Sequence, residues 1–351
     1  PCCLVGSEMC IRDSICPYTI MLNNLFPNVR PRRLRRSKTI RDLVSETKLI
    51  KSKLIQPLFV SESISEKQPL DSMPGQFLFS KDALIIEIEQ LLNLGIKTIA
   101  LFPNITESLK DADGTNALDE KNFICRLVSE IKARYPEIVL ITDVALDPYT
   151  TSGHDGIIKN DIVDNDLTLK ALEKMAVNLA EAGADIVAPS DMMDGRIGVI
   201  RTALEQSDNK DTIILSYSAK YSSNFYGPFR DAVGSRKAEG ISKSSYQMDK
   251  RNLEEALKEA ELDLKEGADI LMVKPGMPYL DVIHKLSLNL SAPIFAYQVS
   301  GEYAMLQQAI DKKIFEHNVI CETLISLFRA GSSSVITYYA KWVAENYDDI
   351  S

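Results

Sequence analysis

The chain has 351 residues, of which 45% are hydrophobic, 40 are lysine or arginine and 49 are acidic. This is the composition of an ordinary globular protein of one large domain or two modest ones. The formal net charge of −9 argues against nucleic acid as the main partner, and no apolar run approaches the length of a membrane span.

The N-terminal stretch of residues 1–20 fits nothing further along the chain. Its segment PCCLVGSEMCIRDS resembles the translation of a ligated sequencing adapter, and residues 1–20 hold four of the six cysteines. We therefore expect a non-native leader followed by a start at Met21. The remaining Cys125 and Cys321 are far apart in the sequence, so a disulfide framework is not expected and a reducing cytoplasm is the expected location.

Residues 21–50 are interpreted as an N-terminal arm that precedes a domain of residues 51–351. The arm carries one basic cluster, RPRRLRRSK, from Arg30 to Lys38. Such a cluster is either a tail that binds nucleic acid or an arm that contacts an acidic neighbouring subunit. The acidic balance of the whole chain favours the second interpretation.

From residue 54 onward, apolar runs of strand length alternate with segments of helical periodicity. The runs are short and nearly continuous, which is typical of parallel strands that are covered on both faces. The eight predicted strands are Leu54–Val60, Thr98–Phe102, Val139–Leu146, Asp185–Pro189, Thr212–Ser218, Asp269–Val273, Pro293–Val299 and Ser334–Tyr338.

Helical spacing of apolar residues predicts helices over Ala83–Leu94, Leu167–Glu181 and Leu253–Glu266, with Asn165 or Asp166 as the N-cap of the second. Several helices end in a glycine that leads into the next strand, as in LGIKTIALF, AGADIVAPS and EGADILMVK. Such recurrent units indicate βα repeats, and eight βα repeats in about 300 residues indicate an α/β fold of the closed (β/α)₈ TIM-barrel type. An open doubly wound sheet is the alternative, but no Gly-rich fingerprint follows the first strand.

Two predicted strands deliver a lysine at their carboxyl ends: TIILSYSAK ends at Lys220 and ADILMVKPG contains Lys274. Barrel enzymes place their chemistry at this end of the strands, here called the mouth. Because the two lysines follow the fifth and sixth strands, we expect them to point into the same mouth. The other polar residues expected there are Asp143, Asp147, Ser190 to Asp194, Ser218, Ser300 and Tyr338.

A lysine amine becomes a nucleophile when its pKa is lowered by removal from water and by a nearby cation. Lys220 and Lys274 can each supply the cation for the other. A neutral amine attacks a ketone to give a Schiff base, which then serves as an electron sink. Two other interpretations remain open on these residues alone: one lysine is catalytic and the other binds substrate charge, or both are solvated rim residues.

The segment between the fifth and sixth strands, Tyr226 to Gln247, is long, rich in Gly, Ser and basic residues, and without helical periodicity. Such a loop over the mouth is typical of a lid. Arg230 and Lys243 would then hold a substrate carboxylate. An ordinary solvated basic loop fits the composition equally well.

Carboxylates cluster in the loop after the third strand, TDVALDPYTTSGHDG. Asp143, Asp147 and Asp155 can coordinate a hard cation, bind a substrate ammonium or serve only as turn formers. His154 is interpreted as a loop residue and not as a ligand. The DMMD of residues 191–194 is either a metal pair or, more commonly, buried acids bonded to the backbone, with the two methionines in packing roles.

Long segments of the chain closely resemble the porphobilinogen synthase (5-aminolevulinate dehydratase) family, in the right order from about Arg30 to near the C-terminus. The segments are APSDMMDGR, LSYSAKYSSNFYGPFRDA, GADILMVKPGMPY, YQVSGEYAM and ITYYA. The resemblance implies a (β/α)₈ barrel with an N-terminal arm, assembled as a homo-octamer. It also implies a lyase that condenses two 5-aminolevulinates into porphobilinogen, with loss of two waters, in tetrapyrrole (heme) biosynthesis.

The resemblance implies roles for the two lysines. Lys274 in MVKPG matches the lysine that forms the Schiff base with the first-bound substrate, and Lys220 in YSAKY matches the lysine that holds the second. Protons must move between the imines, and Asp143 is the expected relay.

The same comparison implies how the substrate carboxylates are held. Arg230 of GPFRDA and Lys243 match the clamp on the carboxylate of the second substrate. Ser300 of VSGEY and Tyr338, the first tyrosine of TYYA, match the groups on the carboxylate of the first substrate.

The chain departs from the family pattern in the third-strand loop. Zinc-using members carry three cysteines there, whereas this chain has Ala145, Asp147 and Asp155. It resembles the aspartate-rich branch, which is associated with Mg²⁺, with monovalent ions or with no active-site metal, so zinc is not expected. Asp147 and Asp155 are then expected to handle the substrate amine. An allosteric Mg²⁺ site of the family maps onto Glu259, for which an ordinary solvated glutamate is the alternative.

Two rival functions remain at this point. A Schiff-base aldolase on the same barrel would need only one essential lysine. A non-catalytic barrel kept for binding or assembly would bind 5-aminolevulinate, if at all, without making product. The second rival is disfavoured because the chain retains all six residues that match substrate-handling groups, which are Lys220, Arg230, Lys243, Lys274, Ser300 and Tyr338.

Overall fold

A computed structural model of the chain describes residues 28–235 and 241–350. The predicted leader, residues 1–20, and the start at Met21 lie outside the described residues. The chain divides into two units, with the boundary between Glu46 and Thr47, and each unit is described by itself.

The described part of the first unit contains a 3₁₀ turn, η1 (Pro31–Arg35), and a short helix, α1 (Lys38–Leu43). The hydroxyl of Ser37 caps α1 by accepting a hydrogen bond from the amide of Ile40. Neither element has a buried residue, and the basic cluster Arg30–Lys38 is exposed throughout. These residues therefore have no core of their own.

The second unit is a closed barrel of eight parallel strands, as predicted. Neighbouring strands pair in sequence order, and the last strand pairs with the first through Leu54 opposite Val335. This closure rules out the open doubly wound sheet. The barrel strands are β1 (Leu54–Val60), β4 (Thr98–Pro103), β5 (Val139–Val144), β8 (Ile186–Pro189), β9 (Ile213–Lys220), β10 (Ile270–Lys274), β11 (Ile294–Gln298) and β12 (Ser334–Thr337).

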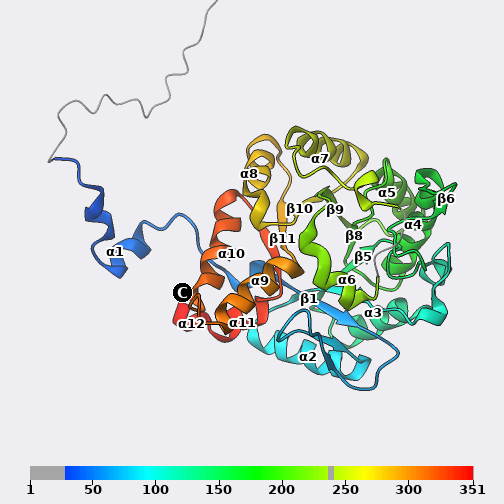
Figure 1. Cartoon of the computed structure of the whole chain (residues 1–351), viewed down its shortest axis with the longest axis horizontal. Coiled ribbons are helices and arrows are strands. Elements are labelled where there is room, and N and C mark those ends of the chain that lie inside the picture. The colour runs from blue at the N-terminus through cyan, green and yellow to red at the C-terminus, as the bar shows by residue number, and fades with distance from the viewer. Residues whose placement is uncertain (1–27, 236–240, 351) are drawn as a thin grey trace, which may run out of the picture. The chain divides into compact units, whose positions relative to one another are not determined.

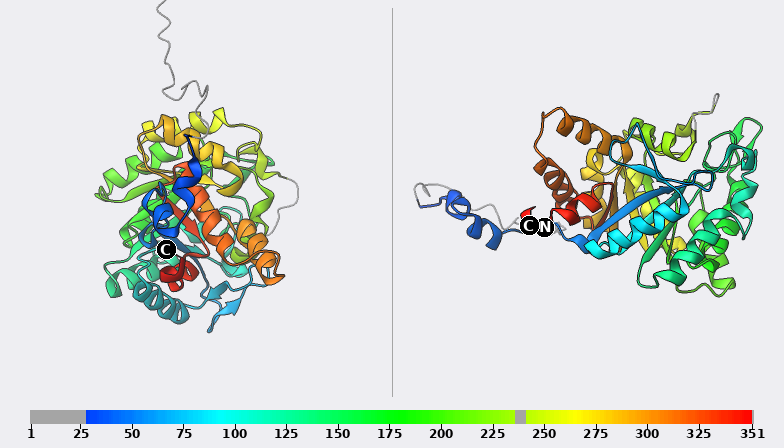
Figure 2. Two further views of the ribbon diagram at one scale, coloured as in Figure 1. Left: turned by 90° about the vertical axis from the view of Figure 1, so that its left-hand side faces the viewer. Right: turned by 90° about the horizontal axis from the view of Figure 1, so that it is seen from below.

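Helices surround the strands, and their apolar faces cover the outside of the barrel (Figure 1 and Figure 2). No helix among the described residues is both long and apolar enough to cross a membrane. The helices are α2 (Lys81–Leu94), α3 (Phe123–Arg134), α4 (Asn165–Glu181), α5 (Arg196–Gln206), α6 (Gly227–Val233), α7 (Glu254–Glu266), α8 (Leu280–Asn289), α9 (Ser300–Asp311), α10 (Asn318–Ala330), α11 (Ala340–Glu345) and α12 (Tyr347–Ile350).

Short elements fill the connections between the barrel strands and helices. β2 (Gln68–Pro69) and β3 (Phe77–Phe79) extend the sheet beside β1, and β6 (Ile158–Lys159) pairs with β7 (Ile162–Val163). The 3₁₀ turns are η2 (Lys51–Lys53), η3 (Glu107–Leu109), η4 (Thr115–Leu118), η5 (Asn224–Tyr226), η6 (Lys243–Ser245) and η7 (Met277–Tyr279).

The three helices predicted from periodicity are confirmed, with one correction at a cap. Asp164, and not Asn165 or Asp166, caps α4, because its side chain accepts a hydrogen bond from the amide of Leu167. The glycines that follow helices take the expected left-handed backbone, with φ of 88° at Gly95 and 110° at Gly267.

The segment from Tyr226 to Gln247 contains more structure than its composition indicated. It forms helix α6 and the turn η6, with residues 236–240 outside the described part. The expectation that this segment lacks helix is therefore wrong. The reason is length, because α6 has only seven residues and so makes about two turns, too few for a repeating apolar pattern.

A buried ion cluster joins the turn after β8 to the neighbouring strand and helix. The Arg196 guanidinium is 2% exposed and lies 3.4 Å from the carboxylate of Asp263 on α7 and 3.2 Å from the hydroxyl of Ser216 on β9. Its Nε lies 3.7 Å from Asp191, whose other oxygen accepts from the amide of Met193. Asp191 is therefore a buried acid bonded to backbone, as the second interpretation of DMMD had it, whereas Asp194 is exposed and does not fit that interpretation.

Candidate active site

The two lysines singled out in the sequence lie side by side. Lys220 ends β9, Lys274 ends β10, and the two residues are direct partners in the parallel ladder between these strands. Side chains at paired positions project from the same face of a sheet. Each lysine is 5% exposed. The prediction that both amines meet at one mouth is confirmed, and their separate chemical roles stay predictions.

Lys220 is held as an ammonium ion. Its Nζ donates to Oδ1 of Asp155 at 2.9 Å and to the backbone carbonyl of Ser190. Burial alone would lower the pKa of Lys220, but the nearby carboxylates, Asp155 foremost, outweigh it and raise the pKa. The expectation that both lysines have lowered pKa values is therefore wrong for Lys220, because the sequence did not show that Asp155 would lie beside it.

The pKa of Lys274 is shifted in the opposite direction. Burial, with the ammonium of Lys220 as the next cause, lowers the pKa of the Lys274 amine to about 7. Within the described residues its Nζ has no ion pair. Four aromatic rings surround it with their centroids 4.7 to 5.3 Å from Nζ; we call this set the aromatic cage, and its members are Tyr217, Tyr226, Phe229 and Tyr297.

Asp155 is the acceptor for several donors of the mouth. Its Oδ1 accepts from Lys220, and its Oδ2 accepts from Lys243 at 2.8 Å and from the hydroxyl of Tyr246 at 2.7 Å. Burial would raise the pKa of Asp155, but the two ammonium groups outweigh it and lower the pKa. Asp147 lies 4.0 Å from the Lys243 amine. Both carboxylates thus form ion pairs with ammonium groups.

Asp143, on β5, has the chemistry of a proton carrier. Its side chain is enclosed at Oδ1, which has no hydrogen-bond partner among the described residues. Burial raises the pKa of Asp143 to about 7, the Asp147 carboxylate acts in the same direction, and the two lysines oppose the shift. A carboxyl group that titrates near neutral pH can both take and release a proton.

The predicted lid reaches the mouth at two points. Phe229 on α6 contributes a wall of the aromatic cage, and Lys243 on η6 binds Asp155. Arg230, the other predicted clamp, is half-buried, and its side chain has no ion pair within the described residues. The structure therefore brings Lys243 into the site and leaves the Arg230 guanidinium available.

Ser300 and Tyr338 lie beside the aromatic cage. The Ser300 hydroxyl accepts from the amide of Phe229 at 3.0 Å and donates to the carbonyl of Phe225 at 3.3 Å. The Tyr338 hydroxyl lies 3.0 Å from that of Tyr297. Both hydroxyls are thus bonded to the protein, and their predicted role on a substrate carboxylate remains a prediction.

The third-strand loop does not fit a thiolate-type zinc site. Ala145 has no donor atom, and the oxygens of Asp155 are occupied by ammonium and hydroxyl groups. Across residues 28–235 and 241–350, no group of three or more His, Cys, Asp or Glu side chains is arranged to hold a metal ion. Glu259 lies half-buried on α7, where burial and the neighbouring Asp263 raise its pKa.

Two residues that lie beside Asp155, His154 and Tyr246, were not predicted from the sequence as part of the site. His154 was interpreted only as a loop residue, but it is 1% exposed and its Nδ1 lies 2.9 Å from the hydroxyl of Tyr246. Tyr246 follows Lys243 by three residues. Its closeness in sequence to this predicted clamp residue was the signal that could have placed Tyr246 in the site. The aromatic cage was also missed, because tyrosines in strands are usually interpreted as core.

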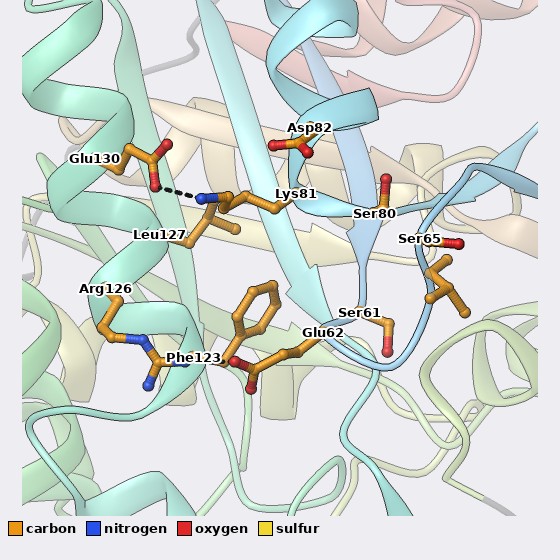
Figure 3. A pocket seen from close by; sticks show the side chains of 11 residues that line it. Ser61, Glu62, Ser65, Ser80, Lys81, Asp82, Phe123, Arg126, Leu127 and Glu130 are labelled. Atoms are coloured by element: carbon orange, nitrogen blue, oxygen red, sulfur yellow. Dashed lines mark hydrogen bonds and ion pairs between the residues drawn. The ribbon is translucent and has the colours of Figure 1, made fainter.

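A separate cavity of about 550 Å³ lies beside β1, between α2 and α3 (Figure 3). Four of its charged side chains form two ion pairs: Lys81 with Glu130 at 3.2 Å, and Arg126 with Glu62 at 2.6 Å. No lysine of the mouth lines it. The mouth is therefore the better candidate for covalent chemistry.

The chain is similar to known proteins over nearly its whole described length. Residues 28–346 match the family model described as delta-aminolevulinic acid dehydratase. Two relatives carry that name. One, from Chlamydia pneumoniae, is 48% identical over 329 residues, which is 92% of this chain and 98% of the relative. The other, from Methanothermus sociabilis, is 49% identical over 320 residues, with coverage of 91% and 99%.

A solved structure is also similar throughout. The delta-aminolevulinic acid dehydratase (porphobilinogen synthase) of Toxoplasma gondii ME49, in complex with the reaction product porphobilinogen, superposes with a TM-score of 0.89 at 46% identity. The match covers 90% of this chain and 91% of that one.

Proposed function

The chain belongs to the delta-aminolevulinic acid dehydratase family, and we infer that it is a lyase that condenses two molecules of 5-aminolevulinate into porphobilinogen, a step of tetrapyrrole biosynthesis. The reaction forms one C–C bond and one C–N bond and releases two molecules of water. The observation that carries the assignment to this mouth is the pairing of Lys220 with Lys274 on adjacent strand ends.

The first chemical step assigned to the site is Schiff-base formation on Lys274. The neutral amine attacks the substrate ketone to give a carbinolamine, and protonation of its hydroxyl followed by loss of water leaves an iminium ion. Burial within the aromatic cage favours this step because it excludes water and, together with the Lys220 ammonium, lowers the pKa of the amine to about 7. The π-faces of the rings also stabilise the positive charge that forms at the iminium nitrogen.

Lys220 is assigned a different part. As an ammonium ion held by Asp155, it is a hydrogen-bond donor and a positive charge in the resting mouth. It can act as a nucleophile toward the second substrate only after a proton leaves it. Asp143 is the acceptor we assign to this proton, because a carboxyl group with a pKa of about 7 can take and release a proton near neutral pH.

The substrate carboxylates are assigned to the groups that the family comparison indicated. The role of Arg230 in binding a substrate carboxylate is supported because its guanidinium has no ion pair within the described residues and can therefore bind an incoming anion. Lys243 would have to share its bond to Asp155 with the substrate. Ser300 and Tyr338 are bonded to Phe229 and Tyr297 of the aromatic cage, and a substrate carboxylate would displace these bonds.

For the metal, we propose that the chain is of the aspartate-rich type without active-site zinc. The support is that Ala145 supplies no donor and that Asp155 already binds two ammonium groups. Mg²⁺ is proposed at the outer helix α7, with Glu259 as a ligand, and there it would act as an allosteric charge. Burial raises the pKa of Glu259, the carboxylates of Asp263 and Asp194 act in the same direction, and the Arg196 guanidinium, which pairs with Asp263, opposes the shift.

The homo-octamer and the cytoplasmic location are also proposals. The first unit supports an assembly, because Leu34 is 54% exposed and Leu43 82% exposed on elements without a buried residue. The free thiols of Cys125 and Cys321 support a reducing compartment. Light scattering on the purified chain, read as mass per particle, tests the assembly.

The test of the proposed function is pyrrole formation from 5-aminolevulinate, followed colorimetrically in the presence of chelator, Mg²⁺ or Zn²⁺. We expect porphobilinogen in all three conditions, with a higher rate in Mg²⁺ than in chelator. Activity that needs Zn²⁺ and is absent with Mg²⁺ would contradict the aspartate assignment. Turnover of an aldehyde donor–acceptor pair without pyrrole would instead favour the aldolase alternative.

A further inference from the structure

The carboxylate of Glu302 is buried in the barrel without a cation. Glu302 lies in the first turn of α9 and is 0% exposed. Within the described residues it makes no ion pair. A buried carboxylate costs free energy unless its oxygens are hydrogen-bonded. Burial raises its pKa to about 7, and hydrogen bonds from three backbone amides oppose that shift.

Those three amides come from two different segments of the chain. Oε1 accepts from Met277 at 2.5 Å, and Oε2 accepts from Gly276 at 3.4 Å and from Val299 at 2.6 Å. Gly276 and Met277 follow Lys274 by two and three residues, and Val299 immediately precedes Ser300. One side chain therefore joins the turn that carries the proposed nucleophile to the start of α9.

The same turn of α9 also touches the lid. Ser300 binds the backbone of Phe225 and Phe229, and a Cβ on Gly301 would lie 2.5 Å from the carbonyl oxygen of Phe225. Phe229 is a wall of the aromatic cage. The first turn of α9 thus contacts both the backbone beyond Lys274 and a ring that covers its amine.

We propose that Glu302 is a positioning residue for the reaction, whose carboxylate fixes the turn after Lys274 against the start of α9 and so sets where the Lys274 amine lies within the aromatic cage. This proposal rests on the proposed function of Lys274. The chemical reason is acceptor geometry, because each oxygen faces backbone N–H donors and only a carboxylate presents two acceptors there.

Glu302 acts through backbone position and not through its charge. The groups that shift the pKa of Lys274 are burial, Lys220 and the three aspartates of the mouth, and Glu302 is not among them. Glu302 is among the groups that raise the pKa of the hydroxyls of Tyr226 and Tyr279, for which burial is the largest cause. Loss of Glu302 should therefore misplace the amine without changing the pH at which it becomes neutral.

The test uses Glu302→Gln in the full chain. Gln keeps the shape but places an NH₂ group against a backbone N–H, whichever way the amide is turned. The reaction with 5-aminolevulinate is trapped by borohydride at saturating substrate across a pH series. We expect the plateau rate of Lys274 labelling and kcat to fall at least about tenfold, toward the hundredfold that a 1 Å misplacement can cost. KM and the pH midpoint of labelling should stay close to those of the unchanged chain.

Two further variants keep the result interpretable. Glu302→Asp retains the charge, but it is too short to reach Met277 and Val299 together, so we expect the same loss of plateau. Asn178→Leu, in α4, removes a part-buried hydrogen bond to the carbonyl of Leu118 in η4, and both residues are far from Lys274 along the chain. It should lower the denaturation midpoint without slowing the labelling.

Each outcome decides something. Unchanged labelling in both Glu302 variants, or a shifted pH midpoint, would overturn the positioning role. A slower rate in Asn178→Leu equal to that in Glu302→Gln would show that general destabilisation is the cause. If the unchanged chain itself is not labelled at Lys274, the proposed function fails, and the Glu302 comparison is not the reason.

Discussion

Replacement of Lys274 by methionine is expected to reduce porphobilinogen formation by about 10⁴-fold or more, the scale seen when a covalent nucleophile is removed. Methionine has a similar length and suits the aromatic cage, so the fold should survive. Lys274→Arg should not restore activity, because a guanidinium stays protonated and cannot form the imine. The measurement is kcat with 5-aminolevulinate, with circular dichroism as the check on folding.

A matched control comes from the opposite end of the barrel. Lys132 on α3 lies 3.0 Å from both oxygens of Asp185, just before β8 begins. Lys132→Met removes a paired lysine away from the mouth and should leave kcat close to that of the unchanged chain. If Lys274→Met retained kcat within about tenfold of the unchanged chain, the assignment of the nucleophile would be wrong.

Replacement of Asp155 by asparagine is expected to have the second-largest effect. Both oxygens of Asp155 accept hydrogen bonds from ammonium groups, so the NH₂ of an asparagine must face one of them. We expect the free energy of unfolding to fall by about 3–5 kcal/mol, the cost of leaving a buried charge without its partner. We also expect kcat/KM to fall by roughly 10²-fold or more, because Lys220 and Lys243 are no longer held in place.

The pH dependence of this effect follows from the two pKa shifts. The pKa of Asp155 is lowered, so its contribution to stability is present above the unfolded value of about 4 and is lost as the pH falls through the folded value. The pKa of Lys220 is raised, so its contribution is present below about 10 and is lost as the pH rises further. The difference in unfolding free energy should therefore be largest near neutral pH.

The control for Asp155→Asn is Asp185→Asn, the other half of the Lys132 pair. The Asp185 and Lys132 side chains are 34% and 20% exposed, so the stability cost should be near the 0–1 kcal/mol of a solvated pair. Denaturant titration at pH 7 and steady-state kinetics measure both variants. Equal losses of unfolding free energy and of kcat/KM in the two variants would contradict the claim that Asp155 contributes more than Asp185 does.

The barrel could be predicted from the sequence because its signals are local. The eight strands are short and nearly continuous apolar runs, and glycines that end helices mark the start of four of them, β4, β8, β10 and β12. Helix α6 could not be predicted, since seven residues are too few to show a period. The cap at Asp164 was placed one or two residues too late because three polar residues stand in a row there.

The site could be predicted only in part, because pKa values depend on neighbours that lie far away in the sequence. Strand order alone placed Lys220 beside Lys274. The opposite pKa shifts of the two lysines come from Asp155, which is 65 residues before Lys220 and raises the pKa of Lys220, and from burial and the Lys220 ammonium, which lower the pKa of Lys274. The role of Glu302 could not be predicted either, because a glutamate in the first turn of a helix usually faces solvent.

The central claim is that Lys274 is the neutral amine and Lys220 is the charged one. The most direct measurement is borohydride trapping with 5-aminolevulinate, followed by peptide mass spectrometry to locate the reduced adduct and by its rate across the pH range. We expect the adduct on Lys274, with a rate that rises as the pH passes about 7, where this amine loses its proton. An adduct found mainly on Lys220, or a rate that does not change around neutral pH, would contradict the claim.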